Sequence, residues 1–334
     1  MLTSELDYEL PEGLIAQKPA VPRASSRLMV VDVGKGTIEH HVFRDLPCFL
    51  GSGDVVVLNE TKVVPARLLV RRPGGGTSEL LFLRSLGEGD NVWEVMARPS
   101  RRLRPGMILA AGPDELRVVE PLKEGRWIVA GVGVPETLRR RGRMPLPPYI
   151  RATPEAERAY QTVYARNPGS AAAPTAGLHF TGEMLGELRG AGAEISYITL
   201  HVGTGTFLPV RVEKLEDHRM HAEYYCVPDE TVRIVSEAVR VVAVGTTVAR
   251  ALESWAESGV REGESEIFIY PGYAWRAVDV LLTNFHLPRS TLLAMVMAFA
   301  GKELVREAYE LAVKERYRFF SFGDAMLLLN GRVR

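Results

Sequence analysis

The spacing of apolar residues changes along the chain, and each change marks a different kind of structure. Close to the N-terminus, a helical pattern covers residues 8–17, and apolar runs at 27–32 and 54–58 predict two buried strands. Farther on, six short β-rich runs are separated by turns that contain Gly and Pro, which predicts a small sandwich or barrel. These runs lie near residues 66–70, 78–84, 92–97, 106–110, 115–121 and 125–132.

Extended and helical patterns alternate after residue 154, which favours a largely parallel sheet with helices on both faces. The preceding segment 142–148 is rich in proline, which can continue neither a helix nor a central strand, so we expect a linker there. The predicted helices cover 154–165, 182–189, 229–239, 248–257, 290–300 and 302–316, and the predicted strands cover 194–202, 241–244, 266–270 and 278–283.

These patterns together predict the α/β fold class, with a mixed, largely parallel sheet, flanking helices and a small inserted all-β domain. The α/β domain is discontinuous and comprises residues 1–62 and 155–334, and the inserted domain comprises residues 63–154. With 334 residues, the chain is long enough for two such domains.

Basic residues are concentrated in the predicted insertion, although the whole chain carries no net charge. Residues 63–154 contain 16 Arg and Lys against 9 Asp and Glu, a balance of +7, so the remainder has a balance of −7. This asymmetry indicates a polyanionic partner. Arginine blocks often only solvate a surface, but three blocks in one small insertion favour phosphate contact. They consist of Arg71, Arg72, Arg98, Arg101, Arg102, Arg104, Arg139, Arg140, Arg141 and Arg143.

The N-terminus and the apolar runs predict neither secretion nor a membrane span. The first seven residues include acids where a signal peptide needs bases, and the longest apolar stretch, 292–300, is about half as long as a membrane span. Cys48 and Cys226 fit neither a disulfide framework nor a zinc pattern, so we expect two free, buried thiols. We therefore predict a cytoplasmic protein.

Four segments at or beside predicted strand ends carry small, hydroxyl-bearing or imidazole residues. Ligands gather at the carboxyl ends of strands in open α/β sheets, so these segments form the candidate site. The first segment, 167–181, consists largely of small residues and includes Thr175, Gly177 and His179. A tight loop with a hydrogen-bonded core histidine is the simpler alternative for this segment.

The other three segments each include or follow the end of a predicted strand. Segment 201–207 could form an anion-binding turn, but it lacks the GxGxxG and Gly-Lys-Ser/Thr patterns and is a weak signal alone. Segment 243–252 runs from a strand into a helix, and the first N–H groups of that helix could bind a carboxylate or phosphate. The alternative is that the threonines of this segment simply cap the helix. Segment 282–292 places a polar cluster before an apolar helix.

Segment 217–223 allows a different interpretation. His218 and His221, three residues apart, could ligate a metal together with Glu223, which would fit a metal-dependent hydrolase. The sequence lacks both a second group of matching ligands and the H-E-x-x-H pattern, so a hydrogen-bonded wall of a substrate site is the better prediction. A non-catalytic RNA-binding protein that uses the basic insertion is a further alternative.

Eight motifs spread over nearly the whole chain form a highly specific set. They are Tyr8-Glu9-Leu10-Pro11 with Ile15-Ala16-Gln17, and the segments 58–67 (LNETKVVPAR), 142–150 (GRMPLPPYI), 160–165 (YQTVYA), 173–181 (APTAGLHFT), 201–207 (HVGTGTF), 221–223 (HAE) and 283–288 (TNFHLP). Together they closely resemble the S-adenosylmethionine:tRNA ribosyltransferase-isomerase family of queuosine biosynthesis. One small difference, the turn Gly74-Gly75-Gly76, should affect only the length of a loop.

This resemblance implies an inserted six-stranded β-barrel and a particular reaction. The ribosyl group of S-adenosylmethionine would be transferred to the aminomethyl group of 7-aminomethyl-7-deazaguanine at the tRNA wobble position and isomerised. Adenine and methionine would leave, and epoxyqueuosine would remain. The resemblance also implies S-adenosylmethionine as co-substrate, tRNA carrying the deazaguanine precursor as partner, and no metal or other cofactor. We expect no membrane contact and a monomer.

Such a reaction requires proton transfers, because the carbon next to the sulfonium is acidified, the attacking ammonium must lose a proton, and departing adenine needs a donor. We therefore expect catalytic roles for His179, His286, His201 and His221, the first two foremost, with Glu223 as an orienting carboxylate. The predicted substrate-binding residues are Thr175, Gly177, Gly203, Thr204, Gly205, Thr206, Gly245, Thr246, Thr247, Asn284 and Arg289. The predicted tRNA-binding residues are Arg98, Arg101, Arg102, Arg104, Arg139, Arg140, Arg141 and Arg143.

Overall fold

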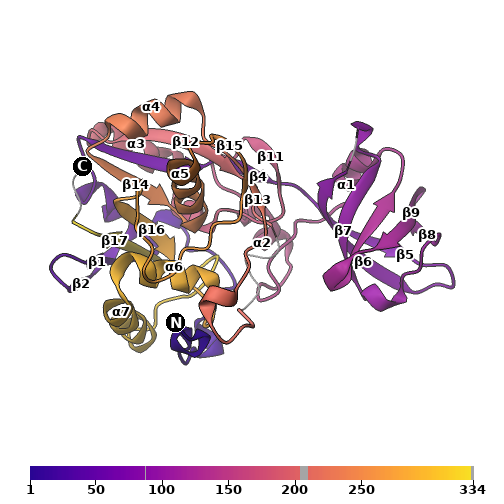
Figure 1. Cartoon of the computed structure of the whole chain (residues 1–334), viewed down its shortest axis with the longest axis horizontal. Helices are drawn as coiled ribbons and strands as arrows, with labels where there is room; N and C mark the ends of the chain where they lie inside the picture. The colour runs from indigo at the N-terminus through magenta and orange to yellow at the C-terminus, as the bar shows by residue number, and fades with distance from the viewer. Residues whose placement is uncertain (87, 204–209, 332–334) are drawn as a thin grey trace. The chain divides into compact units, whose positions relative to one another are not determined.

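The chain divides into two compact units, an α/β unit and a barrel unit (Figure 1). The structure is a computed structural model that describes residues 1–86, 88–203 and 210–331. The α/β unit comprises Met1–Lys62, Pro147–Asn167 and Ala173–Arg334, and the barrel unit comprises Val63–Leu146 and Pro168–Ala172.

A nine-stranded mixed sheet is the basis of the α/β unit. Four central strands, β12, β3, β14 and β16, run parallel to one another. The strand β13 is antiparallel to β12 on one side, and β17 is antiparallel to β16 on the other, where β1 then pairs parallel with β17. The predicted α/β class with a mixed, largely parallel sheet is therefore confirmed. In sheet order the strands are β15 (Glu262–Ser265), β13 (Glu223–Cys226), β12 (Glu194–Leu200), β3 (Asp54–Asn59), β14 (Arg240–Val244), β16 (Val280–Asn284), β17 (Ala325–Leu329), β1 (Arg27–Asp32) and β2 (Thr37–Val42).

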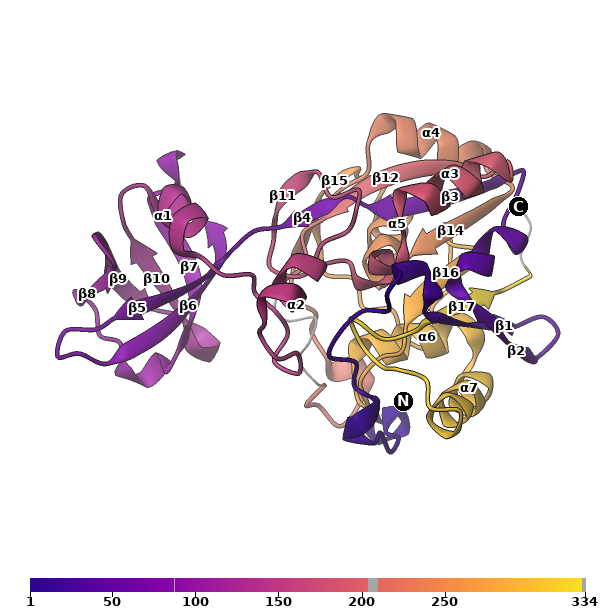
Figure 2. The same cartoon turned by 180° about the vertical axis from the view of Figure 1, so that it is seen from behind.

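Helices cover both faces of this sheet, as Figures 1 and 2 show from opposite sides. On one face, α3 packs Met184 and Leu188 against Val56 and Leu58 of β3. On the other face, α5 contacts the same central strands. The central strand β3 is buried along its whole length, which explains its unbroken apolar run. The helices of this unit are α2 (Pro154–Ala159), α3 (Gly182–Gly190), α4 (Asp229–Glu237), α5 (Thr246–Ser258), α6 (Thr291–Ala300) and α7 (Lys302–Lys314).

A closed antiparallel barrel of six strands forms the barrel unit, as the sequence resemblance implied. Closure leaves no free sheet edge, and alternate residues fill the interior: Leu68 and Val70 are buried, whereas Leu69 between them is exposed. Helix α1 (Val134–Arg141), which the sequence analysis did not predict, packs beside the barrel through Val134 and Leu138. The strands are β5 (Arg67–Arg71), β6 (Thr77–Ser85), β7 (Val92–Arg98), β8 (Ile108–Ala111), β9 (Asp114–Pro121) and β10 (Arg126–Ala130).

Two predicted elements are wrong, and backbone pairing explains both. Residues 8–17 form no α-helix, and a 3-10 turn covers only Glu12–Leu14. The main chain pairs instead with Phe319, whose carbonyl accepts the Ala16 N–H at 3.2 Å. The predicted strand 266–270 is irregular, because β15, immediately before it, is the segment that pairs with β13.

Some predicted properties differ in detail. The helix expected at 154–165 ends at Ala159. Both cysteines are free as expected, but Cys48 is exposed and Cys226 is only partly buried. In the part of the chain that the structure describes, every helix is too short or too polar to cross a membrane. Two further short strands, β4 (Thr61–Val63) and β11 (Asn167–Ser170), pair with each other.

Candidate active site

The carboxyl ends of β12, β3, β14 and β16 lie next to one another, because these four strands are adjacent and parallel. Asn59 and Asn284 are the last residues of β3 and β16. His201 and Gly245 directly follow β12 and β14. The loop 173–181 joins this edge, because two of its side chains form hydrogen bonds with Asn284. We call these strand ends and this loop the strand-end site. It is the edge at which open α/β sheets bind ligands.

Asn59, which the sequence analysis did not single out, ties three elements of the strand-end site together. Its amide nitrogen donates to the carbonyl of Leu200 at 3.0 Å and to Oγ1 of Thr247 at 3.3 Å. Its amide oxygen accepts the N–H groups of Thr61 and Leu200, each at 3.1 Å. The side chain is fully buried, so these bonds are made away from competing water. In the sequence, the signal that could have identified Asn59 is its position as a polar residue at the end of an apolar, buried strand.

His201 is the most accessible imidazole of the strand-end site. Its Nδ1 lies 2.8 Å from Oγ1 of Thr61, and its ring stacks on Tyr224 with the centroids 5.4 Å apart. Its side chain is only half-buried, and among the described residues its hydrogen bond is made through Nδ1, not through Nε2. Partial burial lowers the pKa of His201, so the ring is neutral near pH 7 and able to accept a proton.

A buried ion pair supports the turn that follows β12. Both Glu223 and Arg250 have side chains that are 3% exposed, and Arg250 Nη1 contacts Glu223 Oε2. Glu223 Oε1 accepts the backbone N–H of Gly203 at 2.7 Å, and Arg250 also donates to the carbonyl of Ser265 at 3.1 Å. Glu223 therefore orients the Gly203 peptide. The predicted ligands Thr204, Gly205 and Thr206 lie outside the described residues.

Two glycines allow the loop 173–181 to approach the strand ends closely. Gly245 has a φ of 95°, and a Cβ there would lie 3.4 Å from Cβ of Ala176. A Cβ on Gly177 would lie 1.9 Å from Oη of Tyr164, so no larger residue fits. Thr246 and Thr247 begin α5 directly after Gly245 and are buried, and Thr247 accepts a hydrogen bond from Asn59.

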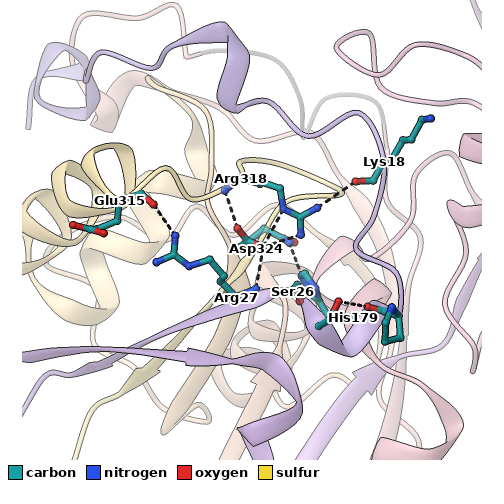
Figure 3. Close-up of polar contacts among 10 residues, drawn as sticks. Lys18, Ser26, Arg27, His179, Glu315, Arg318 and Asp324 are labelled. Atoms are coloured by element: carbon teal, nitrogen blue, oxygen red, sulfur yellow. Dashed lines mark hydrogen bonds and ion pairs between the residues drawn. The ribbon is translucent and has the colours of Figure 1, made fainter.

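His179 is buried and makes a hydrogen bond through each ring nitrogen. Nδ1 lies 2.8 Å from Oγ of Ser26, a contact drawn in Figure 3, and Nε2 lies 3.1 Å from the amide nitrogen of Asn284. The ring also stacks on Phe43 at a centroid distance of 4.8 Å. Burial is the main reason that the pKa of His179 falls to about 4. His179 is therefore neutral at physiological pH.

An ion-pair cluster holds the segment that carries Ser26 (Figure 3). The buried carboxylate of Asp324 accepts the backbone N–H of Arg27 at 3.0 Å and that of Arg318 at 2.8 Å. The Arg318 guanidinium also donates to the same carboxylate at 2.8 Å. Arg27 in turn donates to the carbonyl of Glu315 at 2.7 Å. The start of β1 is thereby fixed next to the imidazole of His179.

His286 lies on the opposite face of the sheet from Asn284. Along β16, Val280 and Leu282 face the α3 side, so Asn284 does too, whereas Thr283 faces the other side. His286 Nε2 bonds Oγ1 of Thr283 at 2.8 Å, and burial lowers the pKa of His286 to about 3. The two histidines expected to be foremost in catalysis thus bond to opposite faces of one strand end.

Two tyrosines hold the backbone of His286. Tyr8 Oη donates to the His286 carbonyl at 2.5 Å, and the His286 N–H donates to Oη of Tyr309 at 3.0 Å. The rings of Tyr8 and Tyr309 meet edge to face, with centroids 5.2 Å apart. Through Tyr8, the N-terminal Tyr-Glu-Leu-Pro motif therefore fixes the backbone of His286 at the edge of the strand-end site.

The remaining candidates of the α/β unit have other surroundings. Arg289 is exposed and donates to the carboxylate of Asp7 at 2.8 Å. His221 is exposed, and the ring of its neighbour His218 packs on Phe268. In the described ranges, no group of three His, Cys, Asp or Glu side chains could hold a metal ion. Glu223, the carboxylate of the metal set considered from the sequence, is paired with the guanidinium of Arg250 instead.

All eight predicted tRNA-binding arginines are exposed in the barrel unit, and they fall at two ends of the barrel. The block 98–104 follows the end of β7, where Oγ of Ser100 accepts the indole N–H of Trp127 at 2.9 Å. The block 139–143 lies at the other end of the strands, where Arg143 pairs with Arg67 at the start of β5. The predicted phosphate contacts are therefore divided between two surfaces of the barrel.

The two arginine blocks also differ in their partners. Arg139 is paired with Glu136, and Arg140 is paired with Asp114 at 3.0 Å. In the other block, Arg104 donates to the carbonyls of Arg101 and Leu103 at 2.8 and 2.7 Å, which stabilises the turn without neutralising its charge. The block 98–104 thus offers more uncompensated positive charge.

Fold and site together define an α/β protein with an inserted antiparallel barrel and a polar site at the ends of adjacent parallel strands. The family model for queuosine biosynthesis protein matches residues 3–328. The chain therefore belongs to the queuosine biosynthesis protein family.

Individual relatives agree with this assignment over nearly their whole length. S-adenosylmethionine:tRNA ribosyltransferase-isomerase of Rubrobacter xylanophilus is 73% identical over 332 residues, which cover 99% of this chain and 98% of the relative. The protein of the same name from Moorella thermoacetica is 51% identical over 350 residues, with coverages of 98% and 100%. A crystal structure of S-adenosylmethionine tRNA ribosyltransferase from Thermotoga maritima matches with a TM-score of 0.57 and 39% identity, covering 98% of this chain and 100% of that one.

Proposed function

We propose that this chain transfers the ribosyl group of S-adenosylmethionine to 7-aminomethyl-7-deazaguanine at the tRNA wobble position and isomerises it. Adenine and methionine leave, and epoxyqueuosine remains in the tRNA. The family assignment makes the chain an S-adenosylmethionine-dependent, tRNA-modifying transferase-isomerase of queuosine biosynthesis. The observation that best supports a site for this reaction is the gathering of imidazole, hydroxyl and amide groups at four adjacent strand ends.

The proposed nucleoside site lies over the ends of β12, β3 and β14. The first turn of α5, with Thr246 and Thr247, supplies N–H groups and the positive end of the helix dipole for the methionine carboxylate. Gly203 offers a close backbone approach at the end of β12, and Glu223 positions it. Thr175 and Asn284 face the same site from the α3 side. Arg289 has weaker support, because it is already paired with a carboxylate.

Three proton movements have to be served during the proposed reaction. A base removes a proton from the ribose carbon next to the sulfonium, the attacking ammonium loses a proton, and the departing adenine gains a hydrogen bond or a proton. We propose that His201 serves one of these transfers, because it is neutral and partly accessible. Catalytic roles for His179, His286 and His221 stay predictions, and the hydrogen bonds of the first two favour positioning roles.

Incubation with ribose-labelled S-adenosylmethionine and precursor-bearing tRNA tests the proposed function directly. We expect label in the tRNA together with one free adenine and one methionine for each ribosyl group transferred. The control is the same tRNA with guanine in place of the precursor, which should take up no label. Formation of S-adenosylhomocysteine would instead indicate methyl transfer, and tRNA binding without any adenine release would indicate the non-catalytic RNA-binding alternative.

The barrel unit, Val63–Leu146 with Pro168–Ala172, differs from the predicted insertion 63–154, because residues 147–154 lie in the α/β unit. We further propose that the barrel unit is the tRNA-binding domain and the α/β unit is the catalytic domain of a monomeric, cytoplasmic enzyme. The exposed arginines at both ends of the barrel support a phosphate-binding role for the insertion. The bonds within the turn 98–104 fix the backbone beneath its guanidinium groups. Phosphates of the tRNA backbone are the chemical groups that such a surface binds.

Replacing Arg101, Arg102 and Arg104 together by Gln is expected to weaken tRNA binding and its dependence on salt. For each arginine–phosphate pair that is removed, the slope of log affinity against log salt concentration should flatten by roughly 0.7–0.9. The measurement is a series of tRNA dissociation constants at several salt concentrations. The matched control replaces three exposed but carboxylate-paired arginines of the α/β unit, Arg158, Arg233 and Arg276. Equal slopes for the two triple variants would contradict the assignment.

A further inference from the structure

We propose that His179 is a positioning residue: with Ser26 it locks the amide of Asn284, which holds the hydroxyl of Thr175 in a fixed direction toward S-adenosylmethionine. This inference rests on the proposed function, because it names a substrate-facing group of the same site. It assigns proton transfer to other residues.

Four side chains form one continuous series of hydrogen bonds. Thr175 Oγ1 donates to Asn284 Oδ1 at 2.8 Å, and the Asn284 amide nitrogen lies 3.1 Å from Nε2 of His179. On the other side of the ring, Nδ1 lies 2.8 Å from Oγ of Ser26. The series connects the strand β16, the loop 173–181 and the residue before β1, and we call it the Ser26–Thr175 relay.

Both ring nitrogens of His179 take part in the relay, and donors and acceptors along it can be assigned in two ways. If the Asn284 oxygen faces Thr175, the amide nitrogen donates to Nε2, and Nδ1–H donates to Ser26. If the amide is turned over, Nε2–H donates to the oxygen, and Nδ1 accepts from the Ser26 hydroxyl. Both arrangements need one proton on the ring, so the imidazole is neutral in both. In the orientation that the structure shows, with the Asn284 oxygen toward Thr175, a second ring proton would place Nε2–H against the amide N–H of Asn284 and would break the relay.

Burial makes this arrangement costly to disturb. The exposed fractions are 1% for Ser26, 5% for His179 and 2% for Asn284, and Phe43 covers one face of the ring. A buried donor or acceptor that loses its partner costs about 1–3 kcal/mol. The lowered pKa of His179, about 4 with burial as its main cause, agrees with a neutral ring, and Arg318 and Arg23 act in the same direction. Only the carboxylate of Asp324 opposes them.

Thr175 is the end of the relay that reaches the surface. Within 171–180 it is the only residue that is not buried, whereas the ring of His179 is enclosed. The substrate can therefore meet the Thr175 hydroxyl, and the imidazole acts on the substrate only through Asn284. Because Asn284 ends a central strand of the sheet, the direction of this hydroxyl is fixed before the substrate binds.

Two amide substitutions of His179 separate positioning from proton transfer. A Gln amide reaches the place of Nε2 and can keep the bond to Asn284, whereas an Asn amide reaches only the place of Nδ1 and can keep only the bond to Ser26. For His179→Asn we expect KM for S-adenosylmethionine to rise by about tenfold or more, and for His179→Gln by only a few-fold. The pH profile of kcat/KM should keep its shape in both variants. His41→Gln and His41→Asn, on the edge strand β2 and outside the relay, are the matched controls.

A catalytic base at position 179 predicts a different result. Neither amide can accept a proton, so a catalytic base at this position would make both variants inactive to the same degree while they remain folded in thermal unfolding. That outcome would overturn the proposal. Thr175→Val should raise the same KM as His179→Asn, and the double variant should show less than the product of the two effects, because both break one relay. Independent, multiplying effects would also contradict it.

Nitrogen-15 NMR of the substrate-free protein keeps this test separate from the proposed function. The His179 ring signals, identified by their loss in His179→Gln, should show a neutral imidazole with unchanged shifts between about pH 5 and 8. Titration of His179 within that range would overturn the relay even if the wild-type enzyme transfers label. Absence of label transfer by the wild type, together with a neutral His179, would instead contradict the proposed function and leave the relay intact.

Discussion

Replacing His201 by Gln is expected to lower kcat by about 10²–10⁴, the usual contribution of a general acid or base. Thr61 holds the ring at Nδ1, and Tyr224 stacks on it, so the orientation of the ring is fixed. Nε2 makes no hydrogen bond with a described residue and can exchange a proton with the substrate. The dissociation constant of S-adenosylmethionine should change by only a few-fold, because the nucleoside contacts proposed for the neighbouring strand ends remain. Single-turnover transfer of labelled ribose and equilibrium binding measure the two quantities separately.

The pH dependence of the wild-type enzyme gives a second check on His201. A base must be unprotonated, so activity is present above its pKa and is lost as the pH falls through that pKa. Because partial burial lowers the pKa of His201, the acidic limb of the kcat/KM profile should lie below the ordinary histidine value of about 6.5. His41→Gln should retain the wild-type profile. A folded His201→Gln variant with wild-type kcat would refute the assignment.

Replacing Glu223 by Ala is expected to lower the free energy of unfolding by about 3–5 kcal/mol. The substitution leaves the Arg250 charge buried without its counter-charge, since both side chains are only 3% exposed. The matched control is Glu262→Ala, which removes an exposed carboxylate that accepts a bond from Tyr224 at 2.8 Å. That control should shift the free energy by no more than about 0.5 kcal/mol. Urea and thermal unfolding measure both variants.

A double substitution separates the structural role of the ion pair from its role in the strand-end site. Glu223→Leu combined with Arg250→Met leaves no charge unpaired and should recover most of the lost stability. The Gly203 N–H would still lack the carboxylate that accepts it in the wild type, so binding of S-adenosylmethionine should stay weakened. Wild-type binding in the stable double variant would show that Glu223 does not position this turn.

The local apolar pattern predicted the elements whose burial repeats regularly. The six runs between 66 and 132 correspond to the six barrel strands, because a closed barrel has one buried and one exposed face along each strand. The run at 54–58 correctly predicted a buried strand, since all residues of β3 are buried. Residues 8–17 misled the same reasoning, because Pro11 begins a turn and the chain then pairs with Phe319.

Long-range hydrogen bonds were not readable from the sequence. His179 and Ser26 are 153 positions apart, and Glu223 and Arg250 are 27 apart, so no local spacing predicts that they touch. Glu223 was expected to act as an orienting carboxylate beside the catalytic histidines, whereas the structure pairs it with the Gly203 N–H and with Arg250, a partner that the sequence did not indicate. Arg250 looked like an ordinary residue of an amphipathic helix, although only 3% of it is exposed.

The sequence by itself determined the fold class, the family and the chemical character of the strand ends, because burial patterns and motifs are local and parallel strands bring their ends together. Tertiary structure alone decided what each imidazole can do. Because side chains alternate along β16, Asn284 and Thr283 lie on opposite faces, so His179 and His286 form hydrogen bonds in different buried surroundings. His201, which follows another strand, is partly accessible. Protonation and access depend on these surroundings, and distant segments of the chain supply them.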